Sequence, residues 1–123
     1  CHECSSERLI SDFESRFTGI SQGSIVCVAN ALSAEEKMHK AEDGSLCTCC
    51  NGTGYRGRIG TFELLRVTRN IREAVRDLRS TQEIEDIAIS EGMLTLKSYA
   101  VQLIQKKLTT VAEVYKICND DEF

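Results

Sequence analysis

The sequence contains no proline, and only 2 of its 123 residues are histidine. Without proline, the ends of helices and strands depend on glycine and on helix-capping residues. The two histidines, His2 and His39, have no neighbouring serine in a recognisable nucleophile motif. We therefore expect no catalytic residues in this chain.

A basic excess and long apolar runs are absent as well. The chain has 15 lysine and arginine residues against 19 acidic ones, which gives a net charge of -4. This balance counts against a nucleic-acid-binding surface. No apolar run approaches the roughly 18 residues that a membrane span needs, and the start shows no signal-peptide pattern. We expect a cytoplasmic protein with no nucleic-acid partner and no direct membrane insertion.

The length of 123 residues is enough for one small domain with a modest core. The first residue is Cys1 and not methionine, so we expect the chain to be part of a longer protein. An activity of that longer protein need not be an activity of this chain alone.

Cysteine is the residue that the sequence has in excess. There are seven, whereas a secreted disulfide framework usually has an even number. Two Cys-x-x-Cys pairs are separated by residues 5–46. Zinc takes four ligands in a tetrahedron, and thiolates satisfy it well. We therefore predict a zinc site formed by Cys1, Cys4, Cys47 and Cys50, which would join the two ends of a long loop.

The sequence leaves other interpretations of the cysteines open. The thiols could be free of metal, or could form adventitious disulfides after purification. A redox pair of the thioredoxin type fits less well, because neither pair lies between a strand and a long helix. His2 could replace one cysteine as a ligand. We expect Cys49 to be a spare thiol, and Cys27 and Cys118 to pack as small hydrophobic residues.

The glycines that follow the second cysteine pair form no nucleotide-binding motif. They show neither Gly-x-Gly-x-x-Gly at the start of a helix nor Gly-x-x-x-x-Gly-Lys-Ser/Thr. We attribute these glycines to the backbone freedom that a metal-binding turn needs. The intervening arginines, Arg56 and Arg58, fit equally well in a solvated loop or against an anion or a carboxylate of a neighbouring subunit.

The first half of the chain gives a mixed pattern of secondary structure. Apolar residues at helical spacing predict a helix within residues 5–17. Residues 25–29 are apolar and β-branched, and could form a strand or a buried turn of helix. Ser33 and Glu36 form a capping-box pattern, which predicts a short polar helix over residues 34–41.

The second half gives a clearer pattern. Residues 59–67 are apolar and partly alternating, which predicts a strand. Apolar residues at helical spacing then predict four short helices. These helices occupy residues 69–79 and the segments that begin after Ser80, Thr95 and Thr110.

Together these elements predict a mainly α fold. A small, irregular, zinc-clamped subdomain over residues 1–58 precedes a strand and a bundle of about four short helices over residues 59–118. Residues 119–123 form an acidic tail that we expect to be frayed. Because metal binding can supply much of the folding free energy of a small unit, Cys47→Ser is expected to loosen residues 1–58 and to leave the later helices largely folded.

These motifs resemble, in their order, the C-terminal part of the type II secretion and type IV pilus-extension ATPases. The likeness rests on the two cysteine pairs and on three stretches. These stretches are CTCCNGTGYRGRIGTFELL at 47–65, EGMLTL at 91–96 and LTTVAEV at 108–114. The resemblance covers residues 47–117 almost continuously.

The resemblance implies a cytoplasmic, homo-hexameric motor that docks on the inner-membrane platform of a secretion or pilus machine. In that family the four-cysteine module binds Zn²⁺ and is structural, and the phosphate-binding loop lies upstream of the first cysteine pair. ATP and Mg²⁺ would be cofactors of the longer protein only. This chain alone is expected not to hydrolyse ATP, and its partners would be neighbouring subunits and the platform.

Two other functions are compatible with the sequence. One is a stand-alone zinc-binding adaptor. The other is a chaperone-type zinc module, because the Cys-x-x-Cys-x-Gly-x-Gly pattern that begins at Cys47 also matches a J-protein cysteine repeat. That module needs several copies of the repeat, and this chain has one complete copy.

Overall fold

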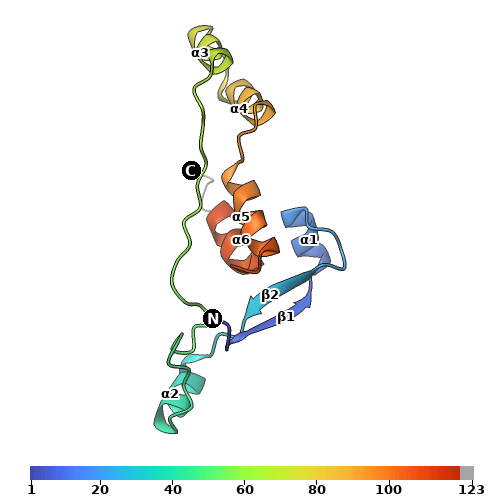
Figure 1. The fold of residues 1–123 in the computed structure, drawn as a ribbon. Helices are drawn as coiled ribbons and strands as arrows, with labels where there is room; N and C mark the ends of the chain where they lie inside the picture. The colour runs from blue at the N-terminus through green and yellow to red at the C-terminus, as the bar shows by residue number, and fades with distance from the viewer. Residues whose placement is uncertain (120–123) are drawn as a thin grey trace. The chain divides into compact units, whose positions relative to one another are not determined.

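The structure, a computed structural model, describes residues 1–119, so nearly all of the predicted acidic tail lies outside the described residues. Within this range there are two short strands and six helices (Figure 1). The predicted mainly α fold is confirmed. No helix in this part of the chain is long and apolar enough to cross a membrane.

The chain divides into two compact units. The first, the cysteine unit, contains residues 1–59 together with residues from 101 onwards; the second, the middle unit, contains residues 60–100. The division predicted from the sequence placed residues 59–118 together in the second subdomain. The last helices instead share contacts with the cysteine-rich segment.

An antiparallel hairpin opens the cysteine unit. Strand β1 (Ser5–Leu9) pairs with β2 (Ile25–Ala29), with Ser5 opposite Ala29. The segment at 25–29, for which the sequence left strand and helix open, is therefore a strand.

The helix predicted within residues 5–17 is wrong in its first part and right in its second. Helix α1 spans Asp12–Thr18 and begins at a capping box, in which Ser11 Oγ accepts a hydrogen bond from the Glu14 N–H at 3.3 Å. The box starts the helix after the strand has ended. Apolar residues before and after the boundary between β1 and α1 happen to follow helical spacing, and therefore suggest one continuous helix.

Two further helices belong to the cysteine unit. Helix α2 (Ala34–Glu42) has the predicted capping box at Ser33 and buries none of its residues. Helix α6 (Val111–Asn119) packs on β2. The core of the unit combines both ends of the chain. Its buried apolar residues are Ile10, Ile20, Val26, Cys50, Leu103, Ile104, Val111 and Val114.

The predicted strand at residues 59–67 is absent from the structure, which gives this segment no regular secondary structure. A strand needs a neighbour for its backbone N–H and C=O groups, and β1 and β2 pair with each other. Apolar side chains of the segment therefore remain exposed, at 70% for Phe62, 76% for Leu64 and 61% for Val67.

The helices predicted after residue 68 are confirmed. In the middle unit, α3 spans Arg69–Arg76 and α4 spans Thr81–Ser90. Helix α3 ends before the predicted residue 79, and Leu78 has a left-handed backbone with φ of 54°. Helix α5 (Leu96–Gln105) begins in the middle unit and ends in the cysteine unit.

Candidate metal centre

The predicted ligands come from two turns at one end of the hairpin. In the first turn, the Cys4 N–H donates to the Cys1 carbonyl at 3.2 Å, immediately before β1. In the second, the Asn51 N–H donates to the Cys47 carbonyl at 2.8 Å. Each turn therefore presents two sulfurs on a tight loop.

The structure brings the four predicted cysteines together. The sulfurs of Cys1, Cys4, Cys47 and Cys50 all lie within 4.8 Å of one another. This set, called here the four-sulfur cluster, joins residues that are up to 49 positions apart in the chain. The cluster could hold a metal ion.

The distance between the Cys1 and Cys47 sulfurs fits two ligands of one tetrahedral ion. The Cys1 and Cys47 sulfurs are 3.9 Å apart, and thiolates bound to zinc at about 2.3 Å would be about 3.8 Å apart. The seven cysteines are all free thiols, so no disulfide competes for these sulfurs. Four thiolates are the donor set of many structural zinc sites.

Cys50 is the most enclosed member of the four-sulfur cluster, with 6% of its surface exposed. Burial raises the pKa of its thiol, but hydrogen bonds from the Gly54 and Gly52 N–H groups and from the Cys4 and Cys47 thiols outweigh it. The result is a pKa of about 7, lower than the ordinary value of 9.0. The thiolate form, which binds metals, is thus stabilised at this position.

Cys4 is affected in the opposite direction. Its thiol shares hydrogen bonds with Cys47 and Cys50, which raise its pKa to about 11. Within the four-sulfur cluster a proton is therefore held at Cys4, while negative charge is favoured at Cys50. A metal ion would have to displace that proton, so its binding would release acid.

Backbone contacts fix the two turns to the hairpin and to each other. The amino group of Cys1 donates to the Gly54 carbonyl at 2.9 Å, which links the first turn to the second. The Asn30 N–H donates to the Cys4 carbonyl at 2.8 Å, and the Leu32 N–H donates to the Gly52 carbonyl at 2.8 Å. The segment that follows β2 therefore contacts both turns.

The glycines after the second pair have a structural reason. Gly52 and Gly54 have φ values of 74° and 78°, in the left-handed region that glycine adopts easily. A Cβ atom on Gly54 would lie 2.8 Å from the Ala29 Cβ. The second turn can thus approach the end of β2 closely.

The other candidate ligands lie outside the four-sulfur cluster. His2 and Cys49 line a cavity of about 370 Å³ next to the cluster, together with Cys27 and Arg56. Cys118 lies in α6 and is half-buried.

Sequence reasoning missed one residue at the site. The Glu3 carboxylate lies 3.4 Å from the Cys47 sulfur, and the thiol can donate a hydrogen bond to it. Its position between Cys1 and Cys4 was the one available signal, because any residue inside a metal-binding turn lies near the metal.

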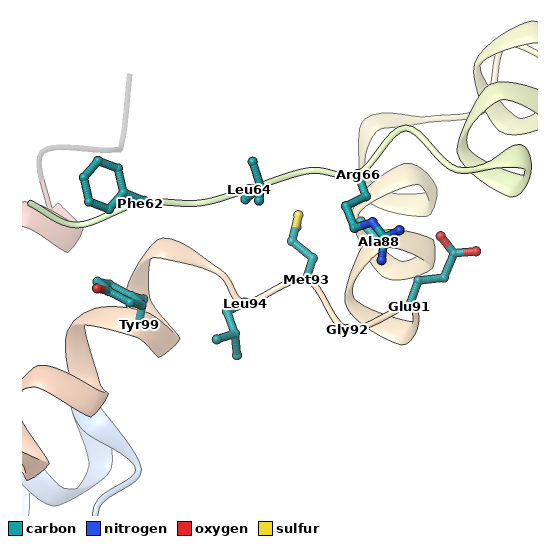
Figure 2. Close-up of a pocket in the computed structure, with 9 residues that line it drawn as sticks. All are labelled: Phe62, Leu64, Arg66, Ala88, Glu91, Gly92, Met93, Leu94 and Tyr99. Carbon is teal, nitrogen blue, oxygen red and sulfur yellow. The ribbon is translucent and has the colours of Figure 1, made fainter.

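A second hollow, of about 360 Å³, lies within the middle unit (Figure 2). It is lined largely by apolar side chains, among them Phe62, Leu64 and Tyr99. Its acidic residue, Glu91, already accepts hydrogen bonds from the side chains of Thr68 and Asn70. These residues offer no set of reactive groups, so the four-sulfur cluster is the stronger functional site.

Comparisons with known proteins give one consistent result. A family model described as "Type II/IV secretion system protein" matches residues 1–116. The type IV pilus assembly ATPase PilB of Thermus thermophilus is 41% identical over 81 residues, which are 66% of this chain and 9% of that protein. The type II secretion system protein HxcR of Pseudomonas aeruginosa is 32% identical over 74 residues, which are 60% of this chain and 16% of that protein.

A further relative matches nearly the whole chain. Type II secretion system protein E of Pectobacterium carotovorum is 26% identical over 122 residues, which are 98% of this chain and 21% of the relative. The matched regions thus span 9 to 21% of the length of these three curated relatives.

Proposed function

Because this chain belongs to the family of type II/IV secretion system proteins, we propose that it is a zinc-binding structural module of a secretion or pilus-assembly motor ATPase. The observation that carries the proposal is the convergence of four sulfurs from two distant turns within 4.8 Å. Names of similar proteins support the motor context, since PilB is called a type IV pilus assembly ATPase.

In this proposal the zinc ion has a structural task. Cys1, Cys4, Cys47 and Cys50 would hold it, and four protein ligands leave no open position for a substrate. Bound zinc would stabilise the folded cysteine unit, because the ligands are brought together only in the folded chain. The four residues would position the two turns, and through them the hairpin.

ATP hydrolysis would belong to parts of the longer protein outside this chain. The sequence has no Gly-x-x-x-x-Gly-Lys-Ser/Thr motif that could cradle the phosphates of ATP. The module would instead contact neighbouring subunits of a homo-hexamer and, in the cytoplasm, the inner-membrane platform of the machine. Arg56 and Arg58 are candidates for such contacts.

Metal analysis of the purified chain tests the proposal. The protein is prepared under reducing conditions without added metal, and its zinc content is measured by mass spectrometry. We expect about one zinc ion per chain, and its loss in Cys50→Ser. Cys49→Ser is the matched control, because Cys49 lies outside the four-sulfur cluster, and it should keep its zinc.

The same pair of variants tests the motor context in the longer protein. Cys50→Ser should abolish secretion or piliation, and Cys49→Ser should not. A chain without zinc, or equal zinc loss in both variants, would contradict the metal site. Normal secretion and piliation in Cys50→Ser would contradict the role in the motor.

A further inference from the structure

Glu3 has an unusual position for an acidic residue. Its Oε2 atom lies 3.4 Å from the Cys47 sulfur, although the two residues are 44 positions apart in the sequence. In a four-thiolate site every sulfur is a negatively charged ligand, so a carboxylate next to one of them adds repulsion. A side chain placed there needs another reason.

The distance itself suggests a reason. The Cys47 thiol donates a hydrogen bond to Glu3 Oε2 at 3.4 Å. A carboxylate oxygen, which zinc accepts as a ligand, thus lies beside the sulfur that it would replace. The carboxylate therefore lies at the edge of the four-sulfur cluster, on the side of Cys47.

The two ligands of the second turn differ in how firmly they are held. Cys50 is buried, with 6% of its surface exposed. Cys47 is half-buried and contacts Cys1 and Glu3. Glu3 is exposed and lines the cavity of about 370 Å³, so its side chain has room to move.

We propose that Glu3 is an exchange ligand of this centre, which binds the metal ion in place of Cys47 when the Cys47 sulfur is not available. The ion would then be held by Cys1, Cys4, Cys50 and one carboxylate oxygen. This inference rests on the proposed zinc site. It gives the centre a way to keep its ion when its more accessible second-turn thiol is lost.

The chemistry of the exchange favours Glu3 over the other nearby donors. A carboxylate and a thiolate carry the same charge, so the net charge of the ligand set stays the same. An exchange with His2 would remove one negative charge. Cys49 lines the same cavity, and a shift of the ion to it would restore four thiolates, which a spectrum distinguishes from three.

Cobalt(II) is the probe, because its absorption spectrum in a tetrahedral site reports the number of thiolate ligands. The full chain and its Cys47→Ala variant are titrated with Co²⁺, each with and without Glu3→Gln. We expect four thiolates in the parent and three thiolates with one oxygen in Cys47→Ala. In that variant Glu3→Gln should weaken Co²⁺ binding by about tenfold or more.

Cys50→Ala is the matched control, because it also removes one ligand of the second turn, but not the one that contacts Glu3. There Glu3→Gln should change Co²⁺ affinity by less than about twofold. The inference is overturned if Cys47→Ala binds no cobalt, if it keeps four thiolates through Cys49, or if Glu3→Gln acts equally in both backgrounds. If the parent itself shows no four-thiolate spectrum, the proposed zinc site fails first.

Discussion

Glu14 joins a strand to a helix through a single carboxylate. Both of its oxygens accept hydrogen bonds from the Arg8 guanidinium on β1, each at 2.7 Å, and one also accepts from the Ser11 N–H at 3.0 Å. The hydrogen bonds from Arg8, more than those from Ser11, lower the pKa of Glu14 from 4.5 to about 2. The ionised form is therefore the one that stabilises the fold.

This pKa predicts how the stability of the chain depends on pH. The contribution of Glu14 is fully present above about pH 4.5 and is lost as the pH falls towards 2. Glu14→Gln should therefore lower the free energy of unfolding by roughly 1 kcal/mol at pH 7, and by progressively less below pH 4.5.

Urea unfolding at several pH values measures this difference. Glu36→Gln is the control, because Glu36 closes the same kind of capping box at Ser33 without the paired arginine that Glu14 has. It should cost less than Glu14→Gln. A loss at pH 3 as large as the loss at pH 7 would contradict the assigned role of the Glu14 charge.

At the scale of secondary structure, the helices that the sequence predicts well are those marked by local signals. The capping boxes at Ser33 and Ser80 involve residues three positions apart, and both helices begin where the sequence placed them. The box at Ser11 was overlooked, because apolar residues before and after it suggested one longer helix. It was nevertheless readable as a serine followed three positions later by a glutamate.

The segment at 59–67 shows the limit of such signals. Its apolar and partly alternating residues are compatible with an extended backbone. A strand also requires a second strand beside it. No local pattern contains that information. The same limit applies to Glu3, whose neighbour Cys47 is distant in sequence.

The close approach of the second turn to β2 makes a prediction about Gly54. In Gly54→Ala the new Cβ would lie 2.8 Å from the Ala29 Cβ, in addition to the cost of a left-handed backbone. Gly57→Ala is the control, because Gly57 has a similar φ of 69° with nothing within 4 Å of such an atom. Chemical unfolding should therefore show Gly54→Ala to be less stable than Gly57→Ala by about 1 kcal/mol or more. Equal losses would mean that the turn can move away from β2 without cost.

At the scale of the whole molecule, the sequence does not reveal which segments belong to the cysteine unit and which to the middle unit. The cysteine unit is closed by contacts between distant positions, such as the ion pair between Lys107 and Glu7 at 2.6 Å. The Tyr55 hydroxyl and the Thr110 Oγ, 2.8 Å apart, form another such contact. Sequence patterns identified α6 as a helix but could not tell on which side of the predicted boundary it would pack.

This grouping changes the expected result of metal removal. A chelator should reduce the protection of backbone amides in the hairpin and in α6 together, because both contribute to the core of the cysteine unit. Amides of α3 and α4 should change much less. Hydrogen exchange measured by mass spectrometry resolves the two groups.

Cys50→Ser, which is expected to lose its zinc, offers a reference for this experiment. It should show much of the loosening before the chelator is added, and little further change afterwards. If α6 keeps its protection while the hairpin loses it, the division predicted from the sequence would describe the protein better than the contacts in the structure.

The route of the chain between its two units has a mechanical consequence. The chain leaves the cysteine unit after residue 59 and re-enters it at residue 101. The middle unit is therefore an insertion with two covalent connections to one host, rather than an appendage on a single linker. Any load applied to the inserted segment would divide between two tethers, and cleavage of one of them would leave the other to keep it attached.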